Sequence, residues 1–514
     1  MNIVIKNDEK EYFCVIKNMK KYSFILIILC FVSFGSLMAQ NDVVPKHEYR
    51  AVWLATIKNL DWPRTLVVTP EDIEQQQQEL VVILDSLQVA GINTVMLQTR
   101  IRGNLIYPSA IEPFSAVFTG AEGRSPGYDP LSFAIEMCHK RGIQLHAWIV
   151  TMPVGNDEQV EAQGELSLPS RMRAMCTHYK DAWYMEPGNP DVAPYLASIA
   201  AEVVSNYDID GIHLDYIRYP DFTDGYPDAP LHRKYGRKQT LASWRRNNIT
   251  NIVKAIYSAV KELKPWVRVS SAPLGKYDKL SRYDSYGWDA YNAVYQEAQL
   301  WLRNGIMDAL FPMLYYKGNH FYPFVRDWCE NSYGRHIVPG LGIYRLQAIY
   351  GGWDMLEIER QMRTSRSAGA NGIMLFRTAH LLGNASGAYD VYTKVYKEKA
   401  LVPPMTWYGT KPAAPVIKEA KRENHTVKVS WSSVEPQEGH PAVKYNVYAV
   451  LDTVADISNV RNLVSIELCD TTFTWHCRTY KPITIAVTAV DAYGVESEPA
   501  VFTFMNVKKS TDNR

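Results

Sequence analysis

The feature that most constrains the fold is an alternation that runs from Tyr49 to the segment 389–399. Short β-branched or aromatic runs alternate with longer amphipathic segments, which is typical of repeated βα units. About eight such units over roughly 350 residues predict a TIM-type (β/α)8 barrel with insertions after several strands. An open doubly wound sheet is the alternative, but no Gly-rich phosphate loop follows the first expected strand.

The expected strands are short and are bounded by turn residues. They span Arg50–Ala55, Thr94–Gln98, Gln144–Ile149, Gly211–Asp215, Arg268–Ala272, Ala309–Leu314, Ile337–Gly342 and Gly372–Phe376. Thr69-Pro-Glu-Asp predicts a helix start, because a capping Thr precedes a Pro at the first helical position. Asp129-Pro-Leu and Asn189-Pro-Asp predict further helix starts of the same kind.

A second domain is expected after the barrel, which should occupy residues 46–400. Residues 401–411 contain Leu-Val-Pro-Pro-Met and predict a stiff linker. Residues 412–506 alternate apolar and polar side chains without a helical period, which favours a small all-β sandwich. The run Thr484–Ser497 resembles the last strands of a fibronectin type III module, and Trp431 stands where such a module has an early core tryptophan. Modules of that kind usually act as spacers or binding units.

The N-terminal segment has the pattern of a secretory signal peptide over residues 1–39. Met19-Lys-Lys precedes the apolar run from Phe24 to Phe34, and Ala39 precedes a polar sequence. The apolar run is shorter than the roughly 20 residues that a spanning helix needs, so we expect cleavage and no remaining membrane span. Translation from Met19 would leave residues 1–18 as an unused upstream start. The expected location is periplasmic, envelope-associated or extracellular.

Composition excludes several kinds of partner. The formal net charge is +1, so no overall field would hold nucleic acid. Aromatic residues make up 12% of the chain, with 33 Tyr and 13 Trp, and flat rings suit stacking on sugars as well as core packing. The seven cysteines include no CxxC pair, and neither HExxH nor a phosphate loop is present. We therefore expect no cofactor and no metal, and the sequence does not predict an oligomeric state.

Barrel chemistry lies at the C-terminal ends of the strands, so the strand list predicts a site. Asp215 ends the fourth strand with His213 on the same face, and we expect it to be the catalytic nucleophile or general base. Glycoside hydrolysis normally uses two carboxylates, so Asp61 or Glu112 is expected to assist the leaving group. The other residues expected to contact substrate are Trp62, Arg100, Asn104, His146, Trp148, His213, Tyr216, Arg218 and Tyr315. A mononuclear metal held by His146, His213 and Asp215 is a weaker alternative.

Several motifs in order resemble a bacterial family of glycosyl-hydrolase-like proteins related to family 10. They are Glu48-Tyr-Arg-Ala-Val-Trp-Leu-Ala-Thr, Asn59-Leu-Asp-Trp-Pro, Leu145-His-Ala-Trp, Glu186-Pro-Gly-Asn-Pro, Asp210-Gly-Ile-His-Leu-Asp-Tyr and Trp244-Arg-Arg-Asn-Asn. The resemblance covers residues 46–400 and implies a secreted or envelope TIM-barrel glycosidase, with peptidoglycan glycan strands among the substrates.

The chain departs from that family pattern where acids are common. Tyr216 stands where a second successive acid is frequent, and Asn104 follows Gly103 where the family often has Asp. The expected activity is hydrolysis of O-glycosidic bonds in a polysaccharide or glycan strand. The alternative is a non-catalytic carbohydrate-binding or envelope scaffold protein that kept the barrel.

Overall fold

The structure is a computed structural model that describes residues 44–408, 411–423, 425–436 and 443–505. The expected signal peptide and the upstream start lie outside these residues. No helix in the described part of the chain has both the length and the apolar character needed to cross a membrane.

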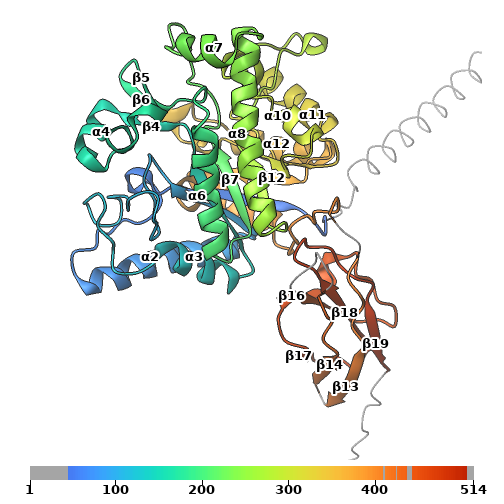
Figure 1. The fold of residues 1–514 in the computed structure, drawn as a ribbon. Helices are drawn as coiled ribbons and strands as arrows, with labels where there is room; N and C mark the ends of the chain where they lie inside the picture. Colours follow the sequence, from blue (N-terminus) through green and yellow to red (C-terminus); the bar gives the residue numbers. More distant parts are fainter. Residues whose placement is uncertain (1–43, 409–410, 424, 437–442, 506–514) are drawn as a thin grey trace, which may run out of the picture. The chain divides into compact units, whose positions relative to one another are not determined.

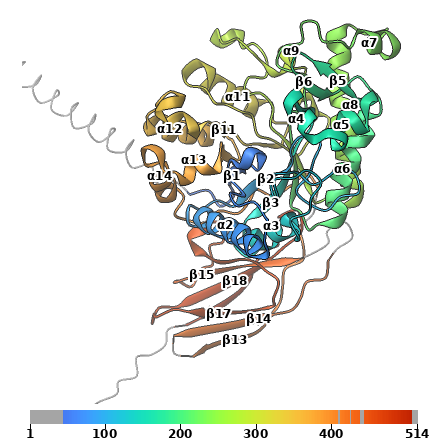
Figure 2. The same ribbon diagram turned by 90° about the vertical axis from the view of Figure 1, so that its left-hand side faces the viewer.

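A parallel sheet forms the centre of the larger domain (Figures 1 and 2). Its strands are β1 (Tyr49–Leu54), β2 (Thr94–Arg100), β3 (Gln144–Val150), β7 (Gly211–Asp215), β8 (Arg268–Ser271), β9 (Ala309–Leu310), β10 (His336–Ile337), β11 (Gly340–Leu341) and β12 (Gly372–Leu375). Their spatial order is β10-β9-β8-β7-β3-β2-β1-β12-β11. Each predicted strand is therefore confirmed, and the seventh appears as the two short strands β10 and β11.

The two ends of this strand order meet, because β10 and β11 are consecutive segments of one stretch of chain. β10 pairs with β9, whereas β11 pairs with β12. A parallel bridge between Met313 and Gly340 joins the same region. The sheet thus follows the order of a TIM-type barrel, and all of its recorded pairings are parallel.

Helices surround the strands, as Figure 2 shows around β1, β2 and β3. They are α2 (Pro70–Val89), α3 (Pro130–His139), α6 (Val192–Asn206), α7 (Ala229–Tyr235), α8 (Leu241–Leu263), α9 (Ala290–Ala293), α10 (Ala298–Arg303), α11 (Tyr322–Glu330), α12 (Met355–Ser367), α13 (Thr378–Leu382) and α14 (Ala388–Val395). Side chains that point outward from the strands, such as Val52 and Leu54, pack against these helices in the main core. Inward side chains, such as Trp53 and Trp148, form a separate core inside the barrel.

Local sequence sets two of the three predicted helix starts. Thr69 and Asp72 form a capping box at the start of α2. Asp129 caps α3 by accepting hydrogen bonds from the backbone N–H groups of residues 131 and 132 at 3.0 Å. The third prediction was wrong in position, because α6 begins at Val192. Asn189 instead accepts a hydrogen bond from the backbone N–H of Asp191 at 2.9 Å, so its side chain orders the turn before the helix.

A long insertion between β3 and α6 builds one wall above the barrel. It contains β4 (Pro153–Asn156), α4 (Asp157–Gln163), α5 (Leu168–Arg171), β5 (Cys176–Tyr179) and β6 (Ala182–Met185). These strands form a small antiparallel sheet in the order β4-β6-β5. The insertion follows the C-terminal end of a barrel strand, where loops carry function in this fold.

The C-terminal domain is a β-sandwich. One sheet has the order β13-β14-β17 and the other β16-β15-β18-β19, with antiparallel pairing in both. The strands are β13 (Ile417–Glu423), β14 (Thr426–Trp431), β15 (Lys444–Val450), β16 (Leu463–Leu468), β17 (Thr472–His476), β18 (Ile483–Val490) and β19 (Ala500–Phe504). Trp431 lies in its core, with its ring centroid 5.4 Å from that of Tyr445. The predicted sandwich is confirmed, and the fibronectin type III identity stays a prediction.

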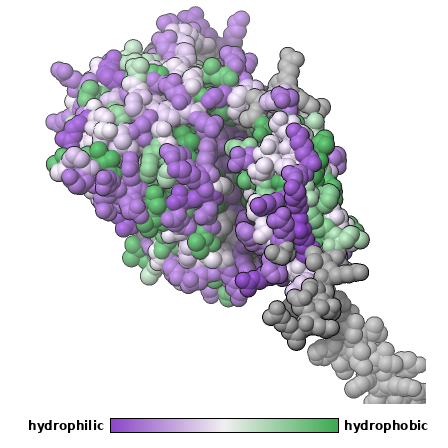
Figure 3. Space-filling view, turned by 90° about the horizontal axis from the view of Figure 1, so that it is seen from below, coloured by the Kyte–Doolittle hydropathy of each residue, from purple (hydrophilic) through white to green (hydrophobic). Residues whose placement is uncertain are grey.

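The surface view in Figure 3 shows mostly hydrophilic residues on the face turned to the viewer. Hydrophobic residues are scattered among them. Isolated exposed apolar side chains of this kind are normal for a protein surface. That face therefore gives no indication of a docking site.

Candidate active site

Asp215 is the last residue of β7 and lies at the C-terminal end of the barrel. Its side chain is buried, and two groups donate hydrogen bonds to its carboxylate. Trp148 Nε1 donates to Oδ2 at 3.1 Å, and the backbone N–H of Tyr216 donates to Oδ1 at 2.7 Å. The register of β3 and β7 pairs Val150 with Asp215, which places Trp148 on the inward face close to the carboxylate.

Burial raises the pKa of Asp215 from 3.8 to about 6. The bonds from Tyr216 and Trp148 and the charges of Arg218 and Arg102 act in the opposite direction, but they offset only part of the desolvation. A carboxyl group with a pKa near 6 can hold a proton at the start of a reaction and release it near neutral pH. Such a group suits general acid or general base chemistry.

The turn after Asp215 is held in an unusual backbone conformation. Tyr216 has a φ of 52°, in the left-handed region that non-glycine residues rarely adopt. Its ring is 38% exposed, and the Arg218 guanidinium carbon lies 4.7 Å from the ring centroid. Arg218 also forms an ion pair with Asp221. This turn therefore presents an aromatic face and a cation beside the buried acid.

A pocket of about 250 Å³ opens beside this turn. The insertion contributes one side, through residues of β5 and β6 and the turn between them. The lining residues are Arg102, Pro153, Tyr179, Lys180, Tyr184, Tyr216, Arg218, Tyr219, Pro220, Asp221 and Phe222. We call this space the mouth pocket. Its mixture of aromatic and charged side chains is suited to a polar ligand with flat apolar faces, such as a sugar.

Glu112 does not stand free at the mouth, because it forms a buried ion pair with Arg100. Arg100 Nε and Nη2 donate to the two carboxylate oxygens at 2.8 and 2.6 Å, and Tyr195 Oη donates to Glu112 Oε1 at 2.9 Å. Arg100 Nη1 also donates to the carbonyl of Thr151 at 2.9 Å, and the Thr151 N–H bonds the Asp215 carbonyl at 2.9 Å. This ion pair therefore braces the strand end next to Asp215.

Asp61 is similarly engaged. Its carboxylate forms an ion pair with Arg377 and accepts hydrogen bonds from the backbone N–H groups of Ala55 at 2.7 Å and Ala379 at 2.9 Å. Burial raises the pKa of Asp61, while Arg377 and the two backbone donors act to lower it. These contacts join the loop after β1 to the start of α13, so the carboxylate has a structural role in this arrangement.

Besides Arg100, three of the expected substrate-binding residues lie inside the protein and have no exposed surface. Trp62 donates to the Gln76 carbonyl at 2.8 Å. His213 Nδ1 lies 2.9 Å from Ser270 Oγ, and its Nε2 accepts a hydrogen bond from Trp53 Nε1 at 3.1 Å. His146 pairs in register with Gly211, at the opposite end of β7 from Asp215. The structure therefore does not bring these three side chains to the mouth.

Burial lowers the pKa of His146 to about 3 and that of His213 well below 6.5, so both rings stay neutral. Within the described residues, no group of three or more His, Cys, Asp or Glu side chains is placed to hold a metal ion. In particular, both ring nitrogens of His213 are already engaged with protein groups.

The remaining predicted residues divide between the mouth and its surroundings. Trp148, Tyr216 and Arg218 lie around Asp215, as described above. The Tyr315 hydroxyl is buried without a hydrogen-bond partner in the described chain, and the charge of Asp215 contributes to raising its pKa. Asn104 donates to Glu122 and accepts from the backbone N–H of residue 102 at 3.2 Å, so it shapes the loop after β2.

Comparison with known proteins assigns the sequence of this chain to a family. Residues 48–337 match the model of the family described as glycosyl hydrolase-like 10. The chain belongs to the glycosyl hydrolase-like 10 family. It is 30% identical over 435 residues to glycosyl hydrolase YngK of Bacillus subtilis (strain 168), covering 80% of this chain and 83% of that protein.

A second relative matches a shorter region of the chain, and the solved structures align at lower sequence identity. Glycosyl hydrolase DigH of Escherichia coli (strain K12) is 33% identical over 286 residues, covering 52% of this chain and 65% of that protein. Among solved structures, α-L-fucosidase isoenzyme 2 from Paenibacillus thiaminolyticus aligns at 17% identity with a TM-score of 0.44, covering 68% of this chain and 49% of that one. This structural likeness is too low to support a functional argument.

In this glycosyl hydrolase-like 10 protein, the mouth pocket includes residues that the sequence did not single out. Arg102, Lys180 and Tyr184 line it. Arg102 could have been found, because it stands in the short stretch Gln98–Asn104 at the end of the second predicted strand. Lys180 and Tyr184 had no comparable signal, since the strand pairing that folds the insertion over the mouth is not visible as a motif.

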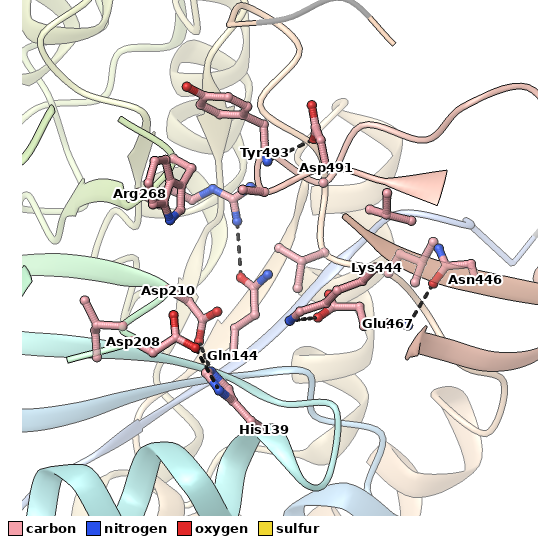
Figure 4. A pocket seen from close by; sticks show the side chains of 17 residues that line it. His139, Gln144, Asp208, Asp210, Arg268, Lys444, Asn446, Glu467, Asp491 and Tyr493 are labelled. Atoms are coloured by element: carbon pink, nitrogen blue, oxygen red, sulfur yellow. Dashed lines mark hydrogen bonds and ion pairs between the residues drawn. The ribbon is translucent and has the colours of Figure 1, made fainter. Parts of the chain in front are cut away.

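A second pocket, of about 160 Å³, lies at the other end of the strands (Figure 4). Its lining includes Gln144 and Arg268, the first residues of β3 and β8, together with residues of the sandwich such as Lys444. His139 and Asp210 form an ion pair there at 2.9 Å. In TIM barrels this N-terminal end contributes to stability, whereas the chemistry lies at the C-terminal end. The mouth pocket is accordingly the candidate active site.

Proposed function

We propose that this protein is a glycoside hydrolase that cleaves O-glycosidic bonds in a polysaccharide or glycan strand, with Asp215 as its acid catalyst. The observation that carries the proposal is the position of Asp215, a buried carboxyl group with a pKa of about 6 at the C-terminal end of β7. Membership of a glycosyl hydrolase-like family supports the same reaction class.

The chemistry assigned to Asp215 is proton transfer to the departing oxygen. In its protonated form, Asp215 gives a proton to the glycosidic oxygen as the bond to the anomeric carbon breaks. The resulting carboxylate is stabilised by the N–H donors of Trp148 and Tyr216. It can then take a proton from the water that attacks the anomeric carbon, which returns the enzyme to its starting state.

The second catalytic role does not fit Asp61 or Glu112 in this arrangement, because each carboxylate is held in an ion pair. We assign that role to the substrate. The carbonyl oxygen of a 2-acetamido group can attack the anomeric carbon while Asp215 protonates the leaving oxygen, and water then opens the cyclic intermediate. This assignment favours a glycan that contains N-acetylated amino sugars, and peptidoglycan strands are the first substrate to test.

The experiment compares wild-type protein with Asp215→Asn on purified peptidoglycan, chitin oligosaccharides, glycosaminoglycans and plant polysaccharides. Release of reducing ends is expected from an acetamido-containing glycan, with a loss of at least about 100-fold in Asp215→Asn. Asp208→Asn is the matched control, because Asp208 precedes the same strand at its other end and its side chain is 89% exposed. Equal activity of Asp215→Asn and wild-type protein would refute the assignment.

A non-catalytic carbohydrate-binding or envelope scaffold role is the second candidate. The engagement of Asp61 and Glu112 in ion pairs favours it, because most glycosidases use two carboxylates. In that case the wild-type protein would bind a glycan in the panel and release no product from it.

We further propose that the protein is exported, to the periplasm, the envelope or the medium. The support is the sequence of the N-terminal segment, in which Met19-Lys-Lys precedes an apolar run and Ala39. The C-terminal sandwich, which resembles a fibronectin type III module in sequence, would then act as a spacer or a binding unit outside the cytoplasm. Detection of a mature chain beginning at Gln40 in the culture medium or in an envelope fraction would test this.

A further inference from the structure

Arg102 lies just beyond β2 and is one of the residues that line the mouth pocket. Its backbone N–H is bonded to Asn104, but its Nε atom is buried and has no hydrogen-bond partner within the described residues. Burial lowers the pKa of Arg102, because the charged guanidinium is largely removed from water. A mostly buried guanidinium of this kind is costly unless it meets an anion.

The neighbouring Arg100 is an example of a buried arginine with a structural role. Arg100 lies two residues earlier, as the last residue of β2, and is fully paired with Glu112. Arg245 is likewise paired through two nitrogens with Asp228, at 2.7 and 2.9 Å. Arg102 forms no ion pair of this kind within the residues that the structure describes, which indicates that its anionic partner comes from outside the protein.

The charge of the residues that line the pocket also favours binding of an external anion. The lining contains Arg102, Lys180 and Arg218 as cations and Asp221 as the acid. Asp221 pairs with Arg218 from a half-exposed position, and Arg218 Nε remains buried without a partner in the described chain. The Lys180 ammonium lies 5.4 Å from the centroid of Phe222 on the same wall. The pocket therefore has an excess of positive charge directly beside Asp215.

We propose that Arg102, with Arg218, binds a carboxylate carried by a sugar next to the scissile bond. The planar guanidinium fork matches a carboxylate in two parallel hydrogen bonds, whereas a neutral hydroxyl would leave its charge uncompensated. This inference rests on the proposed glycosidase function and adds to it a selection for acidic glycans. The carboxylate can belong to a lactyl ether, as on muramic acid, or to a uronic acid.

Binding is measured by calorimetry in an Asp215→Asn background, so that hydrolysis does not interfere. The probes are peptide-free peptidoglycan strands, the same strands with their carboxyl groups reduced to alcohols, chitin oligosaccharides and hyaluronan. The acidic strands are expected to bind at least about 10-fold more tightly than the reduced ones. Arg102→Gln is expected to remove that difference, with an affinity loss of about 10- to 100-fold for the acidic probe alone. Arg102→Lys should retain part of it, since it keeps the charge and loses the fork.

Arg303→Gln is the matched control, because Arg303 is exposed at the end of α10. Circular dichroism checks that each variant is folded. Equal affinity for native and reduced strands, or binding of neither acidic probe, would overturn the inference, and so would an Arg102→Gln variant that keeps the difference. Preference for hyaluronan over peptidoglycan strands would identify a uronic acid as the source of the carboxylate.

The two proposals fail in distinguishable ways. Acidic-probe binding that depends on Arg102, without product release by wild-type protein, would refute the glycosidase function and retain the anion site. Hydrolysis of native and reduced strands with equal kcat/KM would retain the glycosidase function and refute the anion site.

Discussion

Replacing Asp215 with Asn should stabilise the protein, and the gain should grow with pH. The folded state holds the proton of Asp215 more tightly than the unfolded chain does, because burial raises the pKa from 3.8 to about 6. Well below pH 3.8 both states are protonated and no penalty exists. Between pH 3.8 and about 6 the unfolded chain loses the proton while the folded protein keeps it, so the stability of the folded protein falls, and above that range the penalty is complete.

The size of the effect follows from the pKa difference. At about 1.36 kcal/mol per pKa unit, a change from 3.8 to about 6 corresponds to about 3 kcal/mol at full ionisation. Asn does not titrate, so Asp215→Asn avoids this penalty above pH 7. Its amide can accept from either Trp148 or Tyr216 but leaves other donors unmatched, which adds a cost of about 1 kcal/mol that does not depend on pH.

The assay is urea unfolding followed by far-ultraviolet circular dichroism at pH 4 and pH 7.5, for wild-type protein, Asp215→Asn and Asp208→Asn. We expect the free energy of unfolding of Asp215→Asn, relative to wild type, to increase by about 2 to 3 kcal/mol between the two pH values. Asp208→Asn should change this difference by less than about 1 kcal/mol, because it removes only an exposed carboxylate 3.9 Å from His139. A stability difference for Asp215→Asn that is the same at both pH values would refute the assigned pKa.

Three further outcomes are expected. Trp148→Phe removes the hydrogen bond to Asp215 Oδ2, so the limb of the kcat/KM pH profile that reports Asp215 should move to higher pH by about one unit; an unchanged limb would contradict this. Glu112→Gln leaves Arg100 buried without its counter-charge and should lower the free energy of unfolding by about 3 kcal/mol in urea titrations, and a loss under about 1 kcal/mol would show that the pair does not brace the barrel. Glycan hydrolysis, measured by reducing-end release, should be unchanged in EDTA, and loss of activity there would indicate a metal-dependent hydrolase.

Asp215 could be predicted because its signal is local in sequence. Alternation along Gly211–Asp215 puts His213 and Asp215 on one face, and a parallel strand places its last inward residue at the mouth of the barrel. The structure confirms the strand and its end. The pattern could not predict how deeply each side chain is buried: His213 is fully buried, and Asp215 is also buried, while the next residues, Tyr216 and Arg218, line the mouth pocket.

The pairing of the two other candidate acids, in contrast, could not be predicted from local sequence. Asp61 and Glu112 follow the same rule of strand ends, yet whether a carboxylate is free depends on which cation meets it. Asp61 is paired with Arg377, which lies 316 residues away in the sequence. Glu112 is paired with Arg100 and also bonded by Tyr195 from α6. No local pattern encodes those partners, because they are chosen by barrel closure and helix packing.

The sequence by itself determined the βα alternation, the strand that carries Asp215, two of the helix caps and the presence of a C-terminal β-sandwich. Each of these depends on side-chain periodicity or on hydrogen bonds within a few residues. Only the tertiary structure decided the raised pKa of Asp215, the engagement of Asp61 and the position of Arg102 in the mouth pocket. Desolvation and charge pairing depend on all the atoms around a group, and those atoms come from segments that the fold alone brings together.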